Sequence, residues 1–335
     1  MEEIKDKRQA VQLLFIFRFF SIFKFAIMNR RQLIHLLGSA AGVAMLPHVA
    51  TAATSVAKKS RFVPCLNMAT IRGHNLGFVK ELETASKAGF RTVEIWMDTF
   101  QKYLQAGHTV ADARKVLQDT GIEVANSIGF AEWIVDDESR RKKGLEQLAS
   151  EMDLLAAIGC KRVAAPPMGA VQEAGLSLPR AAERYRAILD LGTKTGVVPH
   201  LELWGFSKNL HRLADVAYVA IQSGHPDARV LLDVYHLYKG GSAMESLPLL
   251  SPAAVEIFHV NDYTSAMLPA AITDADRIYP GLGVAPIKQQ LQLLQHPSRP
   301  LILSVEVFNK EYYKQDALAV AKAALAQIGK ITAGV

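Results

Sequence analysis

The sequence predicts an α/β fold in the form of a single (β/α)8 TIM barrel. Short β-rich runs alternate with longer amphipathic stretches from residue 61 onward, which is typical of parallel strands joined by crossover helices. Eight such units in about 280 residues match the number and size of the units of a TIM barrel. A doubly wound sheet would carry a G-x-G-x-x-G turn after its first strand, and none follows Asn67-Met68-Ala69-Thr70 here.

The expected strands are short runs rich in branched and aromatic residues. In chain order they are Phe62–Met68, Thr92–Met97, Glu123–Ile128, Arg162–Ala165, Val198–Trp204, Arg229–Val234, Ala254–Val260 and Leu301–Val307. Amphipathic periodicity predicts helices at Leu76–Ala88, Val110–Thr120, Ser139–Ile158, Leu178–Thr195, Leu210–Ser223 and Ile287–Gln295. Glycines that suit helix ends precede strands two to five, namely Gly89, Gly121, Gly159 and Gly196.

A leader precedes the predicted barrel. Residues 28–52 carry the twin Arg30-Arg31, an uncharged apolar stretch and a small-x-small cleavage site at Ala50-Thr51-Ala52. The apolar stretch at 33–46 is shorter than the ~20 residues that span a bilayer. We therefore expect a cleaved twin-arginine signal peptide and no stable membrane span after processing.

The chain is accordingly divided into three parts. Residues 1–27 precede a good start at Met28 and are expected to be a mis-called upstream extension. Residues 28–52 are the expected signal peptide, and 53–335 the expected barrel, which would be periplasmic.

Composition favours an enzyme-sized globular domain and argues against a nucleic-acid partner. Half of the residues are hydrophobic, which is enough for one substantial core. The formal net charge is +6, but residues 1–27 and 28–52 each supply +2 of it, which leaves the predicted barrel nearly neutral. Cys65 falls in a strand and Cys160 in a turn, so we expect two free thiols.

Strands five to eight each end with a residue type that binds hard metal ions. The four segments are His-Leu-Glu202-Leu-Trp, Leu-Leu-Asp233-Val-Tyr, Ile-Phe-His259-Val-Asn and Ser-Val-Glu306-Val-Phe. A lone His259 would be read as an ordinary core histidine, but four such residues at strand ends are expected to converge. Three carboxylates and one imidazole suit one divalent ion, with Mn²⁺ or Mg²⁺ favoured and Co²⁺ or Zn²⁺ tolerated.

With these motifs the chain resembles the xylose isomerase-like TIM-barrel family over about residues 62–330. That family includes sugar epimerases of the tagatose epimerase kind, hydroxypyruvate isomerase, inosose dehydratase and the AP-endonuclease type. The segments that carry the resemblance are LELWG with Glu202, LLDVYHLYKGG with Asp233 and His236, FHVNDY with His259 and Asp262, DADRIYPGLG with Arg277, and SVEVFN with Glu306.

The resemblance implies roles for these residues. It implies that Glu202, Asp233, His259 and Glu306 hold the metal. It also implies that His236 and Arg277 contact substrate oxygens, and we count Asp262 with the substrate-binding residues. The other histidines lie in expected helices or loops, which argues against the multinuclear zinc site of an AP-endonuclease.

The predicted chemistry is isomerisation or epimerisation of a sugar or polyol-derived ketone by proton abstraction beside a carbonyl, through a metal-stabilised enediolate. Glu202 and Glu306 are the expected catalytic carboxylates, and His236 is expected to contact the developing oxyanion. A lyase, dehydratase or hydrolase acting on keto-sugars or inososes would begin with the same deprotonation. A noncatalytic exported sugar-binding barrel is the alternative of another class, and a homo-oligomer is left open.

Several further residues are candidates for the walls of the site. Trp204 is counted with the substrate-binding residues, and Trp96 and Trp133 could add apolar walls, although ordinary packing is the competing interpretation for all three. Glu94, at the end of strand two, is expected either to bind a distal substrate hydroxyl or to form a salt bridge inside the barrel.

Overall fold

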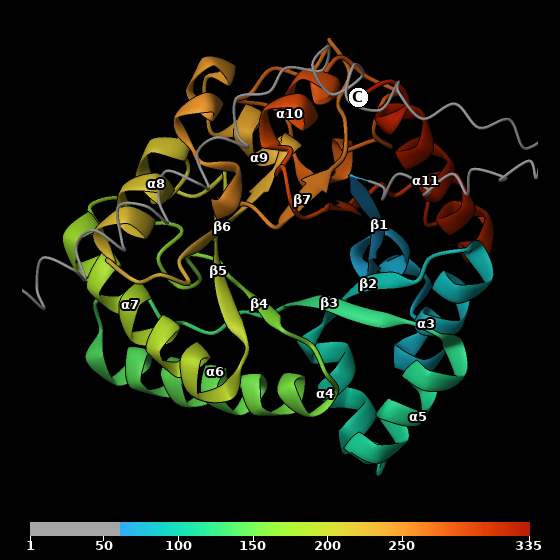
Figure 1. Ribbon diagram of the computed structural model, residues 1–335, viewed down its shortest axis with the longest axis horizontal. Coiled ribbons are helices and arrows are strands. Elements are labelled where there is room, and N and C mark those ends of the chain that lie inside the picture. Colours follow the sequence, from blue (N-terminus) through green and yellow to red (C-terminus); the bar gives the residue numbers. More distant parts are fainter. Residues whose placement is uncertain (1–60) are drawn as a thin grey trace, which may run out of the picture. The chain divides into compact units, whose positions relative to one another are not determined.

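The structure is a computed structural model that describes residues 61–335. The expected upstream extension, the signal peptide and the first residues after it lie outside the described residues. Eight strands lie around a central axis with helices on the outside (Figure 1). The strands are β1 Phe62–Asn67, β2 Thr92–Trp96, β3 Glu123–Ile128, β4 Arg162–Ala165, β5 Val198–Glu202, β6 Arg229–Asp233, β7 Ile257–Val260 and β8 Leu301–Val305.

The helices between the strands are mostly those that periodicity predicts. They are α3 Gly77–Ala88, α4 Met97–Gln105, α5 Val110–Thr120, α6 Glu138–Ala157, α7 Leu178–Thr195, α8 Leu213–Gln222, α9 Val234–Lys239, α10 Ile287–Leu294 and α11 Ala317–Thr332. Short 3-10 helices are η1 Met68–His74, η2 Met244–Leu249, η3 Pro252–Ala254 and η4 Asp274–Asp276.

The sheet has the order β3-β2-β1-β8-β7-β6-β5-β4. All of its ladders are parallel. Strands β3 and β4 lie side by side, and the guanidinium of Arg162 donates to the carbonyl of Ala125 across them. This arrangement confirms the predicted (β/α)8 barrel, because each strand is followed by a connection on the outside.

Five expected strands run one or two residues too far and one starts too early. Strand β5 ends at Glu202 and β6 at Asp233, and Pro252–Ala254 forms η3 before β7. Asp233 explains the second of these ends, because its carboxylate accepts a hydrogen bond from the His236 N–H and so caps α9. When a helix begins directly after a strand, no glycine or proline separates the two elements in the sequence. Helices α4 and α9 both begin in this way, and neither was predicted.

Most of the buried apolar side chains belong to one core. Apolar side chains of the strands and helices form one large cluster, and Ile128, Ala164, Leu231 and Ile257 form a separate small cluster. Both cysteines are free and buried, as expected. No helix among residues 61–335 combines the length and apolar character that crossing a bilayer requires.

Candidate metal and substrate site

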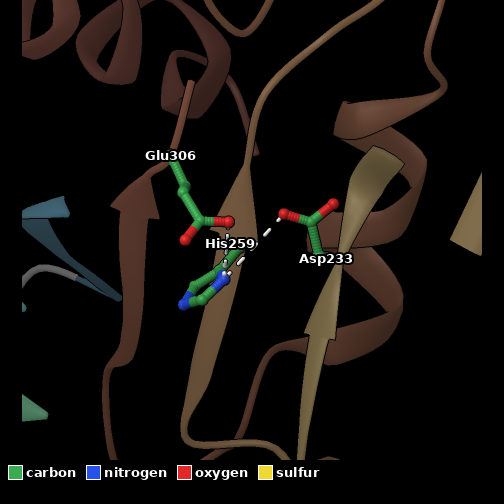
Figure 2. A group of neighbouring side chains, drawn as sticks. All are labelled: Asp233, His259 and Glu306. Atoms are coloured by element: carbon green, nitrogen blue, oxygen red, sulfur yellow. Dashed lines mark ion pairs between the residues drawn. The ribbon is translucent and has the colours of Figure 1, made fainter. Parts of the chain in front are cut away.

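Three expected ligands meet at the carboxyl ends of neighbouring strands. Asp233 ends β6, His259 lies in β7 and Glu306 directly follows β8, and the three side chains point toward one another (Figure 2). Nδ1 of His259 lies 3.4 Å from Glu306 and 3.9 Å from Asp233. One ligand atom from each of the three residues fits within 4.8 Å of the others. The three-residue cluster can therefore hold a metal ion.

Neighbouring amides orient the two carboxylates of this cluster. Asn261 donates to Oδ2 of Asp233 at 2.8 Å, while the other oxygen of Asp233 caps α9. Asn67, at the end of β1, donates to Oε1 of Glu306 at 2.9 Å. Because each amide fixes one oxygen, the carboxylates are held in place before any ligand binds.

Glu202 lies in the same cavity but outside the three-residue cluster. It ends β5, its side chain is buried, and its Oε2 atom has no hydrogen-bond partner in the described structure. A buried carboxylate oxygen without a donor is costly unless a ligand or a proton satisfies it. The unpartnered oxygen of Glu202 is therefore available to a ligand or a proton.

The cavity around these residues has a volume of about 250 Å³. Its polar side comprises Glu202, Glu306, His236, Arg277 and Asp274. Its other side is lined by Ile128, Trp96, Phe130, Trp204, Phe206 and Phe308. Ring contacts with centroids 5.1–6.2 Å apart connect these five aromatic side chains into a continuous arc. The cavity thus offers a ligand both polar groups and aromatic rings.

His236 faces the cavity as a neutral imidazole. Its Nδ1 accepts the N–H of Gly205 at 3.3 Å, so the neutral ring carries its proton on Nε2, which lies 3.4 Å from Nη2 of Arg277. Burial and the nearby Arg277 guanidinium hold the pKa of His236 well below its usual value. His236 can therefore donate a hydrogen bond to a ligand oxygen but is not a cation at neutral pH.

Arg277 is a buried cation in contact with the carboxylates. Nη1 donates to Glu306 at 2.7 Å and to Asp233 at 3.4 Å, and Nη2 pairs with Asp274. The guanidinium also lies over the Tyr235 ring, 4.2 Å from its centroid. Among the described lining residues Arg277 is the one Lys or Arg, and three carboxylates already neutralise it. The cavity therefore offers no free cation for a phosphate group.

The two glutamates differ in their affinity for a proton. Burial raises the pKa of Glu202 to about 8, and the Glu306 charge adds to this rise. Burial also opposes ionisation of Glu306, but the His259 and Arg277 charges outweigh it and hold the Glu306 pKa well below its usual value. Without a metal, Glu202 is therefore protonated at neutral pH and Glu306 is ionised.

The donor set fits a divalent ion. Asp233, Glu306 and Glu202 supply oxygen atoms and His259 supplies one nitrogen, which is a mainly hard set. The pKa of His259 is raised because the Glu94 and Glu306 charges overcome its burial. Neither ring nitrogen forms a hydrogen bond of good geometry, although carboxylates lie near both of them. Closely spaced buried carboxylates around an imidazole are what a cation would stabilise.

Asp262 was expected to bind substrate, but it binds backbone amides instead. Its carboxylate accepts the backbone N–H groups of Tyr263, Gly281, Gly283 and Ala285 at 2.8–3.0 Å. A Cβ on Gly283 would lie 2.1 Å from the Tyr263 carbonyl, so only glycine fits this close approach. Asp262 is absent from the cavity lining and orders the loop that carries Arg277.

Glu94 and Trp133 also lie away from the cavity lining. Glu94 is fully buried inside the barrel, where its Oε2 lies 2.8 Å from Nε2 of His259. This contact favours the salt-bridge interpretation of Glu94 over contact with a substrate hydroxyl. Trp133 donates its indole N–H to the Pro166 carbonyl and packs in the core, whereas Trp96 and Trp204 do line the cavity.

Sequence reasoning missed the residues that support and line this site. Asn67 and Asn261 orient the carboxylates, and Phe130, Phe206 and Phe308 complete the aromatic arc. A signal was available for each, because all five lie at or within four residues of the end of an expected or observed strand. A polar or large aromatic residue at that position faces the carboxyl end of the barrel.

The remaining candidate histidines stay apart from the site. His74 contacts the backbone carbonyls of Ile71 and Gln315, and His108 stacks on Tyr103. His211 and His225 lie near surface aspartates. Within residues 61–335, Asp233, His259 and Glu306 form the one such cluster of possible metal ligands.

The raised pKa of Glu202 predicts how pH affects the metal-free protein. The folded state binds this proton more tightly than the unfolded state, whose glutamate has a pKa near 4.5. Its contribution to stability is therefore complete below pH 4.5 and is lost as the pH rises through about 8. Glu202→Gln cannot ionise and should not show this loss. Calorimetric Tm values of the two metal-free proteins should diverge over this range, and parallel curves would contradict the assignment.

The comparisons with known proteins agree with the barrel fold. The model of the xylose isomerase-like TIM barrel family matches residues 82–328. An inosose isomerase of Bacillus velezensis is 28% identical over 272 residues, which cover 78% of this chain and 93% of that protein. An inosose isomerase of Halalkalibacterium halodurans is 26% identical, with coverage of 78% and 93%.

A solved structure shares the fold. The IOLI protein, crystallised with a zinc atom, superposes with a TM-score of 0.74 at 23% identity and covers 81% of this chain and 98% of its own.

Proposed function

The chain belongs to the xylose isomerase-like TIM barrel family, and we propose that it is a divalent-metal-dependent isomerase or epimerase of an unphosphorylated sugar or polyol-derived ketone. The observation that carries this proposal is the buried cluster of Asp233, His259 and Glu306 at the strand ends, in which Glu306 lines the same cavity as Glu202. Its curated relatives point to inososes as the first substrates to test.

The proposed metal site uses Glu202, Asp233, His259 and Glu306. A bound divalent ion would polarise the carbonyl and hydroxyl oxygens of the substrate and so acidify the neighbouring C–H bond. Zinc bound to the IOLI protein supports a divalent metal, while the mainly oxygen donor set favours Mn²⁺ or Mg²⁺.

Proton transfer, hydrogen bonding to the substrate and exclusion of water are assigned to side chains of this chain. Glu202 and Glu306 exchange the proton, and their unequal proton affinities suit an acid and a base. His236 donates its Nε2–H to a substrate oxygen, and Arg277 holds Glu306 ionised. The aromatic arc packs against the C–H face of the substrate and excludes water.

The substrate class is proposed from charge and size. A cavity of about 250 Å³ has room for a single sugar or cyclitol ring. Because Arg277 is neutralised by three carboxylates, a phosphate group would find no cation there. This favours neutral ketones over sugar phosphates.

Product analysis tests the function. The metal-reconstituted protein is incubated with ketoses, inososes and keto-glycosides, and the products are identified by NMR. The proposal expects an isomer or epimer from at least one neutral ketone. A dehydrated or cleaved product would place the protein among lyases or hydrolases, and saturable binding without any product would identify a noncatalytic sugar-binding barrel.

We also propose that the protein acts in the periplasm after export by the twin-arginine route, which the motif at residues 28–52 supports. Arg30→Lys combined with Arg31→Lys should retain the precursor in the cytoplasm. Cell fractionation and N-terminal sequencing measure this outcome. Recovery from the periplasm of a processed double variant that begins near Ala53 would show that the leader is misread.

A further inference from the structure

Glu94 is a fully buried carboxylate with more partners than a structural salt bridge requires. It lies in β2 at 0% exposure and accepts hydrogen bonds from Asn67, Asn126 and Ser304. These donors come from β1, β3 and β8, and His259 approaches from β7. Strands on both sides of β2 therefore fix the position of this one carboxylate.

The contact with His259 is specific to one ring nitrogen. Nε2 of His259 lies 2.8 Å from Oε2 of Glu94, while Nδ1 faces Asp233 and Glu306. Ser304 and Asn67 donate to the same oxygen, at 2.6 and 3.1 Å, so its place is fixed independently of the histidine. Because a carboxylate contacts Nε2, the other ring nitrogen, Nδ1, faces any ligand that binds to the three-residue cluster.

We propose that Glu94 is a positioning residue for the metal site, holding the His259 imidazole so that Nδ1 faces Asp233 and Glu306. This inference rests on the proposed metal-dependent function. Metal-binding histidines ordinarily place their second nitrogen against a carboxylate or carbonyl, which sets the tautomer and the ring orientation.

Asn67 extends this arrangement to a second ligand. Its amide nitrogen donates to Glu94 and also to Oε1 of Glu306. Its carbonyl oxygen accepts the indole N–H of Trp96, which lines the cavity. Glu94 thereby contacts one ligand directly and a second through a single amide.

The test compares Glu94→Gln and Glu94→Ala with the wild type and with Glu151→Gln. Glu151 is a matched control, because it is also buried and accepts hydrogen bonds from two glutamines, but it lies on helix α6. Glu94→Gln keeps the volume and one acceptor oxygen, and the unpartnered Oδ1 of Asn126 can accept from the new amide. This variant is therefore expected to fold.

Two readouts separate positioning from simple structural support. Mn²⁺ titration of the Glu94 variants should give affinities ~10–100-fold weaker than those of the wild type. Nitrogen-15 NMR of the metal-free and Zn²⁺-loaded proteins should show the His259 ring signals shifted in Glu94→Gln. In Glu151→Gln both readouts should stay at their wild-type values.

Unchanged Mn²⁺ affinity together with an unchanged His259 spectrum in Glu94→Gln would overturn the inference. A wild-type protein that binds neither Mn²⁺ nor Zn²⁺ would instead overturn the proposed metal site. The His259 spectrum of the metal-free protein would still decide in that case whether Glu94 orients the ring.

Discussion

Replacing Glu202 or Glu306 by glutamine is expected to lower turnover by the ~10²–10⁴-fold that is typical of losing a general acid or base. Glutamine keeps an oxygen but cannot exchange a proton, so metal binding should survive in part. The matched control is Glu151→Gln, which replaces another buried carboxylate outside the cavity and should keep near-normal turnover once folded.

The two variants should also differ from each other. Both oxygens of Glu306 are engaged, by Asn67 and Arg277, whereas one oxygen of Glu202 is free of hydrogen bonds and the residue lines the cavity. We therefore expect Glu202→Gln and Glu306→Gln to lose different partial reactions, solvent exchange in one and completion of inversion in the other. Near-normal rates in both variants with metal bound would show that these carboxylates do not carry the reaction.

The double variant Asp233→Ala, His259→Ala is expected to lose most of its metal. It removes two members of the three-residue cluster and leaves Arg277 beside Glu306, where the guanidinium would repel a cation. Elemental analysis after dialysis should find well below one ion per chain, against one ion in the wild type.

A matched control exists for this double variant as well. His225 and Asp190 form a histidine–aspartate pair with 3.6 Å between Nε2 and Oδ1, outside the cluster of possible ligands. His225→Ala with Asp190→Ala should keep full metal content. Full occupancy in the Asp233→Ala, His259→Ala protein would count decisively against the proposed ligands.

The barrel could be predicted from the sequence because strand and helix signals alternate along it. The four glycines placed ahead of strands two to five all have positive φ, and each of them follows the end of a helix. Helices α4 and α9 could not be predicted in this way, since each begins at the residue that ends or follows a strand. Asp233 serves both the strand and the helix, and periodicity alone does not show such a double role.

Only those residues of the site that lie at the ends of strands could be predicted from the sequence. Asp233, His259 and Glu306 meet as expected because β6, β7 and β8 are neighbours in one parallel sheet. Asp262 was expected to bind substrate but binds backbone amides, and for Glu94 the salt bridge was one of two expected alternatives, because a carboxylate looks the same in sequence whether it faces a cavity or binds buried partners. Their partners come from segments far away in the chain, and only the fold reveals them.

Deuterium incorporation reports whether the protein uses a bound metal ion to abstract a proton beside the carbonyl. The wild-type protein is incubated in D₂O with a neutral ketone, an inosose first, and the carbon beside the carbonyl is followed by NMR with Mn²⁺ or Mg²⁺ supplied and after its removal by a chelator. The account predicts exchange at that carbon with metal, loss of exchange without it, and recovery when the ion is restored. Exchange at the same rate in the metal-free protein, or product formed with no deuterium at that carbon, would contradict it.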